Sequence, residues 1–185
     1  MSEVRTPVDA QGPAERRRSA LERVFLRLPR VGDSLVAALF RLPPASRLRR
    51  RWLAFSFRRG YAATNRRDYA VIGLALAPDY ELTFHESNRL APLDMRGTYR
   101  GVEGFRRVID DWGESWENFT FEPYEVVDLG ERMVLAVRMV GRGRGSGARL
   151  QDELFDVLTM RRGKLVRQVV YGDREAALAA ARGSG

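Results

Sequence analysis

The sequence predicts an α+β domain in which helices come first, one amphipathic helix follows, and an antiparallel sheet completes the fold. The central helix is the clearest element, because its apolar residues recur every three or four positions and therefore share one face. These residues are Phe105, Val108, Ile109, Trp112 and Trp116. Residues 119–171 instead alternate apolar and polar side chains, which is typical of strands joined by short turns. A strongly curved sheet wrapped around the helices would leave a conical cavity.

The basic charge of the chain is concentrated at its N-terminal end. The net charge is +8, and residues 1–67 contain sixteen arginines but only five acidic residues, whereas the remainder is slightly acidic. We therefore divide the chain into a basic, partly helical extension, residues 1–45, and a domain, residues 46–182. An arginine-rich amphipathic segment is suited to an anionic membrane surface or to nucleic acid, and residues 15–51 are the candidates for such contact. The alternative is an extension that packs on the domain with its arginines in solvent.

The extension itself predicts two short helices. Residues 1–14 are rich in proline, glycine and charge, and are expected to be disordered. Helical spacing of apolar residues predicts a helix over 15–28 that Pro29 ends, and a second helix, capped by Asp33 or Ser34, that runs to Leu42. The apolar runs are too short to span a bilayer, and no signal-peptide cleavage site follows them, so a cytoplasmic protein is expected.

The domain begins with a long helix over residues 46–66 and a short one over 69–76, for which Asp68 is a good N-cap. We expect Pro78 to end the short helix and residues 80–85 to form a strand. A loop over 86–98 is long enough to act as a lid. The central helix is expected to close at Asn118. Four strands and a last helix follow, over residues 119–128, 133–140, 149–160, 165–171 and 174–181.

The strand over 133–140 predicts an interface. Arg138 alternates with Val137 and Met139, so one strand face is apolar and the other is mixed. A buried arginine requires an acidic partner. We therefore expect a homodimer through the outer face of the sheet, with Arg138 near an acid of the second copy.

Asp156 is the most informative polar residue, because it alternates with Leu154 and Leu158 on one face of its strand. Burial on an apolar surface raises the pKa of a carboxyl group, and a protonated Asp can donate a hydrogen bond to a developing oxyanion, as in ketosteroid isomerase. The neighbouring strand is expected to present Val169 and Tyr171. The alternative is a plain ion pair with Arg167.

Other candidates surround the expected cavity. His85 is the single histidine and ends the first strand beside Glu86, so either residue is a candidate base. Aromatic and apolar side chains are the candidate ligand contacts, although such residues also form ordinary cores: Tyr61, Phe84, Ile109, Trp112 and Tyr171. With no cysteine and one histidine, no metal site is expected, and no nucleotide or cofactor motif is present, so we predict no cofactor.

Four motifs resemble the SnoaL-like branch of the NTF2-like superfamily: NRRD at 65–68, APDYEL at 77–82, YRGVEGFRRVIDDW at 99–112 and RRGKLVRQVVYGDREAAL at 161–178. The resemblance covers about residues 50–180 and implies a cone of helices in a curved sheet. Relatives include ketosteroid isomerases, polyketide cyclases, epoxide hydrolases, dehydratases and non-catalytic binding modules.

The ketosteroid isomerases place an oxyanion-binding Asp where this chain has Asp156 and a pocket aromatic where it has Tyr171. Their helix Tyr aligns with Gly60, so Tyr61 is one position away. Their base aligns with Phe84, and only Glu86, two residues on, would replace it. The cyclases use a late acidic residue, which matches Asp156 or Asp173.

These observations predict a pocket domain that binds a small hydrophobic molecule. It is either a cofactor-independent isomerase, cyclase or hydrolase that uses acid–base catalysis, or a non-catalytic ligand-binding or dimerisation module. A third possibility is a peripheral protein that the Arg-rich extension holds to acidic surfaces.

Overall fold

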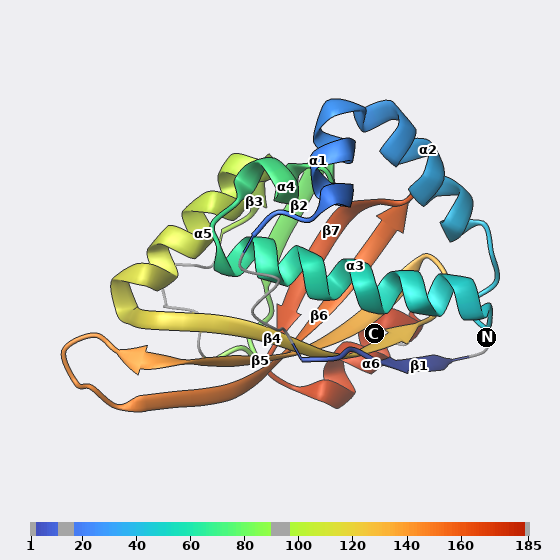
Figure 1. Cartoon of the computed structure of the whole chain (residues 1–185). Helices are drawn as coiled ribbons and strands as arrows, with labels where there is room; N and C mark the ends of the chain where they lie inside the picture. Colours follow the sequence, from blue (N-terminus) through green and yellow to red (C-terminus); the bar gives the residue numbers. More distant parts are fainter. Residues whose placement is uncertain (1–2, 11–16, 90–96, 184–185) are drawn as a thin grey trace.

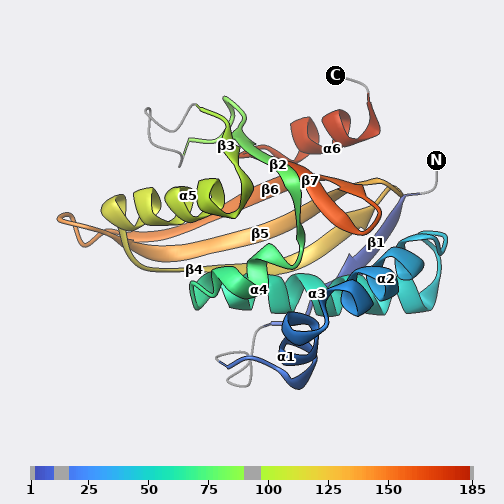
Figure 2. The same ribbon diagram turned by 90° about the horizontal axis from the view of Figure 1, so that it is seen from above.

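One strongly curved sheet runs through the molecule and carries helices on both faces (Figures 1 and 2). The structure is a computed structural model that describes residues 3–10, 17–89 and 97–183. Within these residues the sheet has the strand order β1-β4-β5-β6-β7-β2-β3. All neighbouring strands are antiparallel except β2 and β7, which are parallel. The predicted α+β fold with a curved sheet is confirmed.

The bounds of the elements follow from the hydrogen-bonding pattern. The strands are β1 Val4–Pro7, β2 Leu76–Phe84, β3 Tyr99–Arg100, β4 Trp116–Asp128, β5 Arg132–Gly143, β6 Arg149–Arg161 and β7 Lys164–Tyr171. The helices are α1 Ala20–Arg27, α2 Pro29–Phe40, α3 Arg47–Asn65, α4 Tyr69–Gly73, α5 Gly101–Ser115 and α6 Arg174–Arg182.

The two faces of the sheet have separate apolar cores, because side chains alternate along each strand. Helices α3 and α5 lie on the inner face, where Leu53 and Trp112 pack against inward strand residues such as Leu135 and Leu158. Helix α6 lies on the opposite face and covers a second cluster that includes Val157. Figure 2 shows this arrangement from above, with α6 on one side of the sheet and α3 on the other. Any cavity inside the cone is therefore lined by inward residues only.

The first residues of the extension belong to the sheet. β1 pairs with β4, and Val8 continues the pairing through a 2.9 Å hydrogen bond from its N–H to the carbonyl of Tyr124. Val8 is buried in the inner core. The expected disorder of residues 1–14 is therefore wrong for residues 4–8. A short edge strand of this kind depends on its partner strand rather than on its own composition.

The two helices of the extension begin at different residues from those predicted. α1 begins at Ala20, where the Ser19 side chain accepts from the N–H of Glu22 and Glu22 reciprocates in a capping box. Pro29 ends α1 but also starts α2, because proline fits the first turn of a helix. Asp33 and Ser34 consequently lie inside α2 and cap nothing.

Three further boundaries differ from the predictions. α4 ends at Gly73, and Pro78 lies within β2, where the pairing with β7 is interrupted by a register shift between Leu76 and Glu81. The central helix ends at Ser115, because Trp116 is already extended, and Asn118 lies in an irregularity of β4 with φ 53°. The centre of the predicted lid, residues 90–96, lies outside the described residues.

Two arginines that contact β4 differ in burial. Arg49 of α3 is buried and forms two hydrogen bonds of 2.7 and 2.8 Å with Asp128 at the end of β4. Arg138 of β5 is half-buried, lies over the ring of Tyr124 and is 3.9 Å from the carboxylate of Glu122. The homodimer that Arg138 suggested stays a prediction.

Candidate functional site

Asp156 lies on the inner face of β6, as its alternation with Leu154 and Leu158 predicted. It is 3% exposed, and its carboxylate accepts a hydrogen bond from the hydroxyl of Tyr61. Tyr61 reaches it from α3, which crosses the same face of the sheet. The neighbouring strand presents Val170 opposite Asp156 rather than Val169 and Tyr171. Arg167 lies opposite Thr159 and is exposed, so the alternative ion pair does not form.

A second pair of polar side chains supports the carboxylate. The side-chain amide of Gln168 on β7 donates a hydrogen bond to Asp156. The amide oxygen of Gln168 in turn accepts a 2.7 Å hydrogen bond from the hydroxyl of Tyr80 on β2. Tyr80 is fully buried. The four residues thus form a polar network inside an apolar core, and such a network holds its members in fixed orientations when each is satisfied.

The surroundings of the network determine the protonation of Asp156 and Tyr61. Burial raises the pKa of Asp156 to about 6, and the hydrogen bonds from Tyr61 and Gln168 oppose part of that rise. Burial, followed by the charge of Asp156, raises the pKa of Tyr61 well above its ordinary value. At neutral pH Tyr61 is therefore protonated and acts as a hydrogen-bond donor, and Asp156 titrates near pH 6.

Asp156 opens onto a small inner cavity of about 30 Å³, enough for one water molecule. Four residues predicted as ligand contacts line it, namely Tyr61, Phe84, Ile109 and Trp112. The indole N–H of Trp112 is buried and has no acceptor among the described residues. Because a buried donor without a partner is costly, this N–H is available to an oxygen of a bound molecule.

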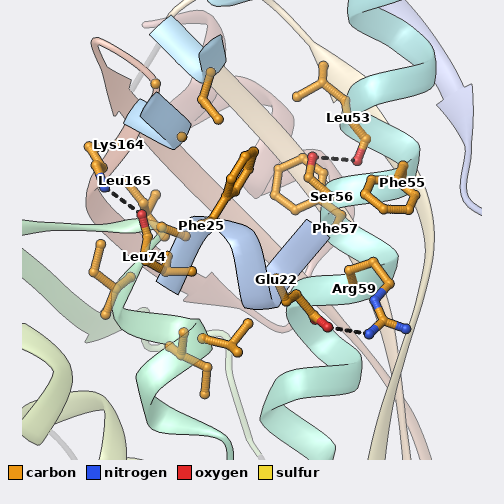
Figure 3. A pocket seen from close by; sticks show the side chains of 18 of the residues that line it. Glu22, Phe25, Leu53, Phe55, Ser56, Phe57, Arg59, Leu74, Lys164 and Leu165 are labelled. Atoms are coloured by element: carbon orange, nitrogen blue, oxygen red, sulfur yellow. Dashed lines mark hydrogen bonds and ion pairs between the residues drawn. The ribbon is translucent and has the colours of Figure 1, made fainter. Parts of the chain in front are cut away.

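A larger outer cavity of about 230 Å³ lies between the extension and the domain. Figure 3 shows Phe25 of α1 in this space, with Leu165 of β7 on one side and Phe57 of α3 on the other. The wall is apolar except for groups that are already paired, such as Glu22 with Arg59. Residues of both extension helices line it, so the extension builds part of the cavity.

The two cavities share four lining residues, Tyr61, Thr64, Phe105 and Gln168. These side chains separate the outer space from the carboxylate of Asp156. Tyr61 is the member that both hydrogen-bonds Asp156 and faces the outer cavity. A molecule in the outer cavity therefore lies next to the acidic network.

His85 and Glu86 do not join this site. The sheet alternation that turns Phe84 inward turns His85 outward, where its ring stacks on Tyr171 with centroids 4.2 Å apart. Glu86 is exposed and lines a separate polar hollow with Asp152 and Glu153. Tyr171 also lies outside the cone, because Val170, its neighbour in the strand, points inward. The expectation that these three residues face the cavity is wrong.

Asp173, the other late acid, accepts a 2.8 Å hydrogen bond from the N–H of Ala176 and caps α6.

Sequence analysis missed Gln168 and Tyr80. Gln168 is a polar residue that shares a strand face with the apolar Val170, and the same kind of alternation identified Asp156. Tyr80 alternates with Leu82 and Phe84, but nothing in the sequence pairs its hydroxyl with Gln168.

The fold and the site together define an α+β cone with a buried carboxylate at the floor of an apolar cavity. The model of the SnoaL-like domain family matches residues 57–168, more than half of the chain, so the chain belongs to the SnoaL-like domain family. No curated protein matches the chain.

Solved structures show the same fold. An NTF2-like protein of unknown function from Burkholderia pseudomallei is 23% identical, with 69% of this chain and 94% of that chain covered and a TM-score of 0.55. An NTF2-like protein from Burkholderia thailandensis is 27% identical, with 68% and 92% covered and a TM-score of 0.52. A protein with a ketosteroid isomerase-like fold from Catenulispora acidiphila is 16% identical, with 66% and 88% covered and a TM-score of 0.51.

Proposed function

We propose that this SnoaL-like domain binds a small, largely apolar molecule and acts on it by acid–base chemistry without a cofactor, as an isomerase, cyclase or hydrolase. The observation that carries the proposal is the pair formed by Asp156 and Tyr61 at the junction of the two cavities. A carboxyl group with a pKa of about 6 is suited to take up and return a proton near neutral pH.

The arrangement suits a substrate whose apolar body occupies the outer cavity and whose carbonyl group and acidic neighbouring carbon reach Asp156 past the side chains that separate the two cavities. The carboxylate of Asp156 takes the proton from that carbon, and the electron pair of the broken C–H bond moves to the carbonyl oxygen. Trp112 lines the inner cavity, and its buried N–H, which has no acceptor among the described residues, would stabilise the developing oxyanion. Asp156 then returns the proton to a carbon of the same molecule, so no other reactant is consumed.

A binding module without turnover is the second candidate. Of the described residues that line the inner cavity, only Asp156 carries a carboxylate. Glu86, the other candidate base, lines a separate hollow. A reaction that needs a separate acid and base would have to use Tyr61 or the ligand itself as the second group. A ligand held by Trp112 and Tyr61 without proton transfer would satisfy the same contacts.

The experiment that separates the two candidates is proton exchange in 2-tetralone, an apolar ketone with acidic protons beside its carbonyl. Deuterium uptake from D₂O is followed by NMR for the wild type, for Asp156→Asn and for Glu114→Gln, a control at an exposed acid of α5. We expect Asp156→Asn to lose at least about a hundredfold in the protein-dependent rate, as for removal of a general base, and Glu114→Gln to keep it. Binding of 2-tetralone with equal exchange in all three proteins would support the binding module.

A further inference from the structure

An apolar ridge is exposed on the extension, away from the cavity. Val24, Leu28, Val31 and Leu35 are 46%, 54%, 57% and 46% exposed. They follow one another at spacings of four, three and four residues. The N–H of Leu28 bonds the carbonyl of Val24 at the end of α1, and the N–H of Val31 bonds the carbonyl of Leu28 at the start of α2, with Leu28 in a non-helical conformation between the two helices. We call these four exposed side chains the α1–α2 ridge.

The ridge adjoins the apolar residues by which the same helices pack on the domain. Leu21, Phe25, Gly32 and Val36 of these helices line the outer cavity. The inward faces thus complete the domain, and packing within the chain leaves the ridge in solvent. Leu48, at the first turn of α3, is also 60% exposed.

Unpaired positive charge borders the ridge. Six exposed arginines in this region form no ion pair within the described part of the chain: Arg23, Arg27, Arg30, Arg41, Arg47 and Arg51. Other arginines of the same helices behave differently, since Arg49 pairs with Asp128 and Arg59 with Glu22. The helices that carry the exposed apolar side chains therefore also carry free positive charge.

We propose that α1, α2 and the first turn of α3 dock on an anionic lipid bilayer, with the α1–α2 ridge in the headgroup region and the six arginines on lipid phosphates. A bilayer surface offers both an apolar boundary and negative charge, which is the combination that an interfacial amphipathic helix requires. Nucleic acid offers phosphates but leaves Leu28 and Val31 exposed. Among the helices that the structure describes, none is long and apolar enough to cross a membrane.

The docked helices also form one wall of the outer cavity. The cavity consequently lies directly behind the membrane contact, with Phe25 and Val36 on the inner side of the same two helices. An apolar ligand that is dissolved in the bilayer would be close to this cavity.

Vesicle flotation of the full chain tests the proposal. Vesicles of pure phosphatidylcholine are compared with vesicles that contain 30% phosphatidylglycerol, at low and at high NaCl. Two double variants remove one feature each: Val31→Gln with Leu35→Gln removes apolar surface, and Arg27→Gln with Arg30→Gln removes charge. The matched charge control is Arg142→Gln with Arg149→Gln, an exposed pair opposite each other in β5 and β6.

We expect the wild type to bind only the anionic vesicles and to be released by salt, because the charges are screened. The arginine variant should bind about thirtyfold more weakly, since each basic residue near such a surface contributes about fivefold. The apolar variant should lose at least about tenfold, and the control pair should retain binding.

Three results would overturn the proposal. The first is equal binding of the wild type to neutral and anionic vesicles, which needs no variant to fold. The second is full binding by the apolar variant, which would leave only charge attraction, as for nucleic acid. The third is a wild-type dimer, without lipid, that the apolar variant converts to a monomer, because the ridge would then be covered by a second copy.

Discussion

Tyr61 donates its hydroxyl hydrogen bond to Asp156 across 95 positions of the chain, from the middle of α3 to the inner face of β6. This hydrogen bond lowers the pKa of Asp156, against the larger effect of burial. The pair therefore holds the carboxyl group in the range in which it both accepts and releases a proton near neutrality.

Removing the Tyr61 hydroxyl should raise the pKa of Asp156 further. In Tyr61→Phe the ionised carboxylate of Asp156 loses a hydrogen bond that stabilises it, while its burial stays the same. NMR titration of the labelled carboxyl carbons in both proteins measures the shift. Tyr69→Phe is the matched control, since the Tyr69 hydroxyl is buried without a partner among the described residues. A lower or unchanged pKa in Tyr61→Phe would show that this hydrogen bond does not act on Asp156.

Asp156→Asn should change how stability depends on pH. The pKa of Asp156 in the folded state, about 6, exceeds the unfolded value of about 3.9, so the folded state holds the proton more tightly. Asp156 thus stabilises the fold below about pH 4, and this contribution is lost as the pH rises from 4 through 6. Between pH 4 and 7 the wild type should lose about 2 kcal/mol of unfolding free energy relative to the variant.

Urea unfolding at four pH values measures this difference, with Glu114→Gln as the control for removal of an exposed carboxyl group. If the wild type instead gains stability relative to Asp156→Asn as the pH rises, the pKa of Asp156 is lower in the folded state than in the unfolded state. That result would contradict the raised pKa described for Asp156.

Gly60 offers a way to close the outer cavity. It lies within α3 and lines the cavity, and a Cβ atom placed there meets no atom within 4 Å. Gly60→Ala should raise the unfolding free energy by about 1 kcal/mol through helix propensity and leave binding of 2-tetralone intact. Gly60→Leu should fill the space and weaken binding at least about tenfold. If Gly60→Leu binds 2-tetralone as well as Gly60→Ala does, the ligand does not occupy this cavity.

The ion pair of Arg49 with Asp128 should be essential for stability. Both side chains are at most 3% exposed, so Arg49→Met leaves an uncompensated buried carboxylate and should cost about 3–5 kcal/mol. Arg161 and Asp79 form a pair with the same 2.7 Å separation, but both are about 60% exposed. Arg161→Met should therefore cost at most about 1 kcal/mol. Chemical denaturation of the two variants compares them, and equal losses would refute the role assigned to burial.

Local pattern predicted much of the fold. The helical spacing of apolar residues identified α3 and α5. Alternation of apolar and polar residues identified β4 to β7 and predicted that Asp156 faces inward. These signals depend only on neighbouring residues. Element ends were less predictable. Pro29 both ends α1 and starts α2, and Trp116 belongs to a strand although it continues the helical spacing of α5.

Long-range contacts explain what the sequence did not predict in the site. Tyr171 was expected in the pocket, but the register of β7 puts Val170 opposite Asp156, and register is fixed only by the assembled sheet. The partnership of Tyr80 with Gln168 joins residues 88 positions apart. The outer cavity arises where α1 and α2 meet α3 and β7, which no local pattern specifies.

The pKa of Asp156 in the wild-type protein is the most direct test of the account, because the proposed chemistry requires a carboxyl group that titrates near neutrality. Carboxyl-detected NMR titration, with Asp156→Asn used to assign the signal, measures it without knowledge of the substrate. The account predicts a pKa of about 6. A pKa at or below the ordinary value of about 3.9 would contradict it, and would leave the chain as a binding module.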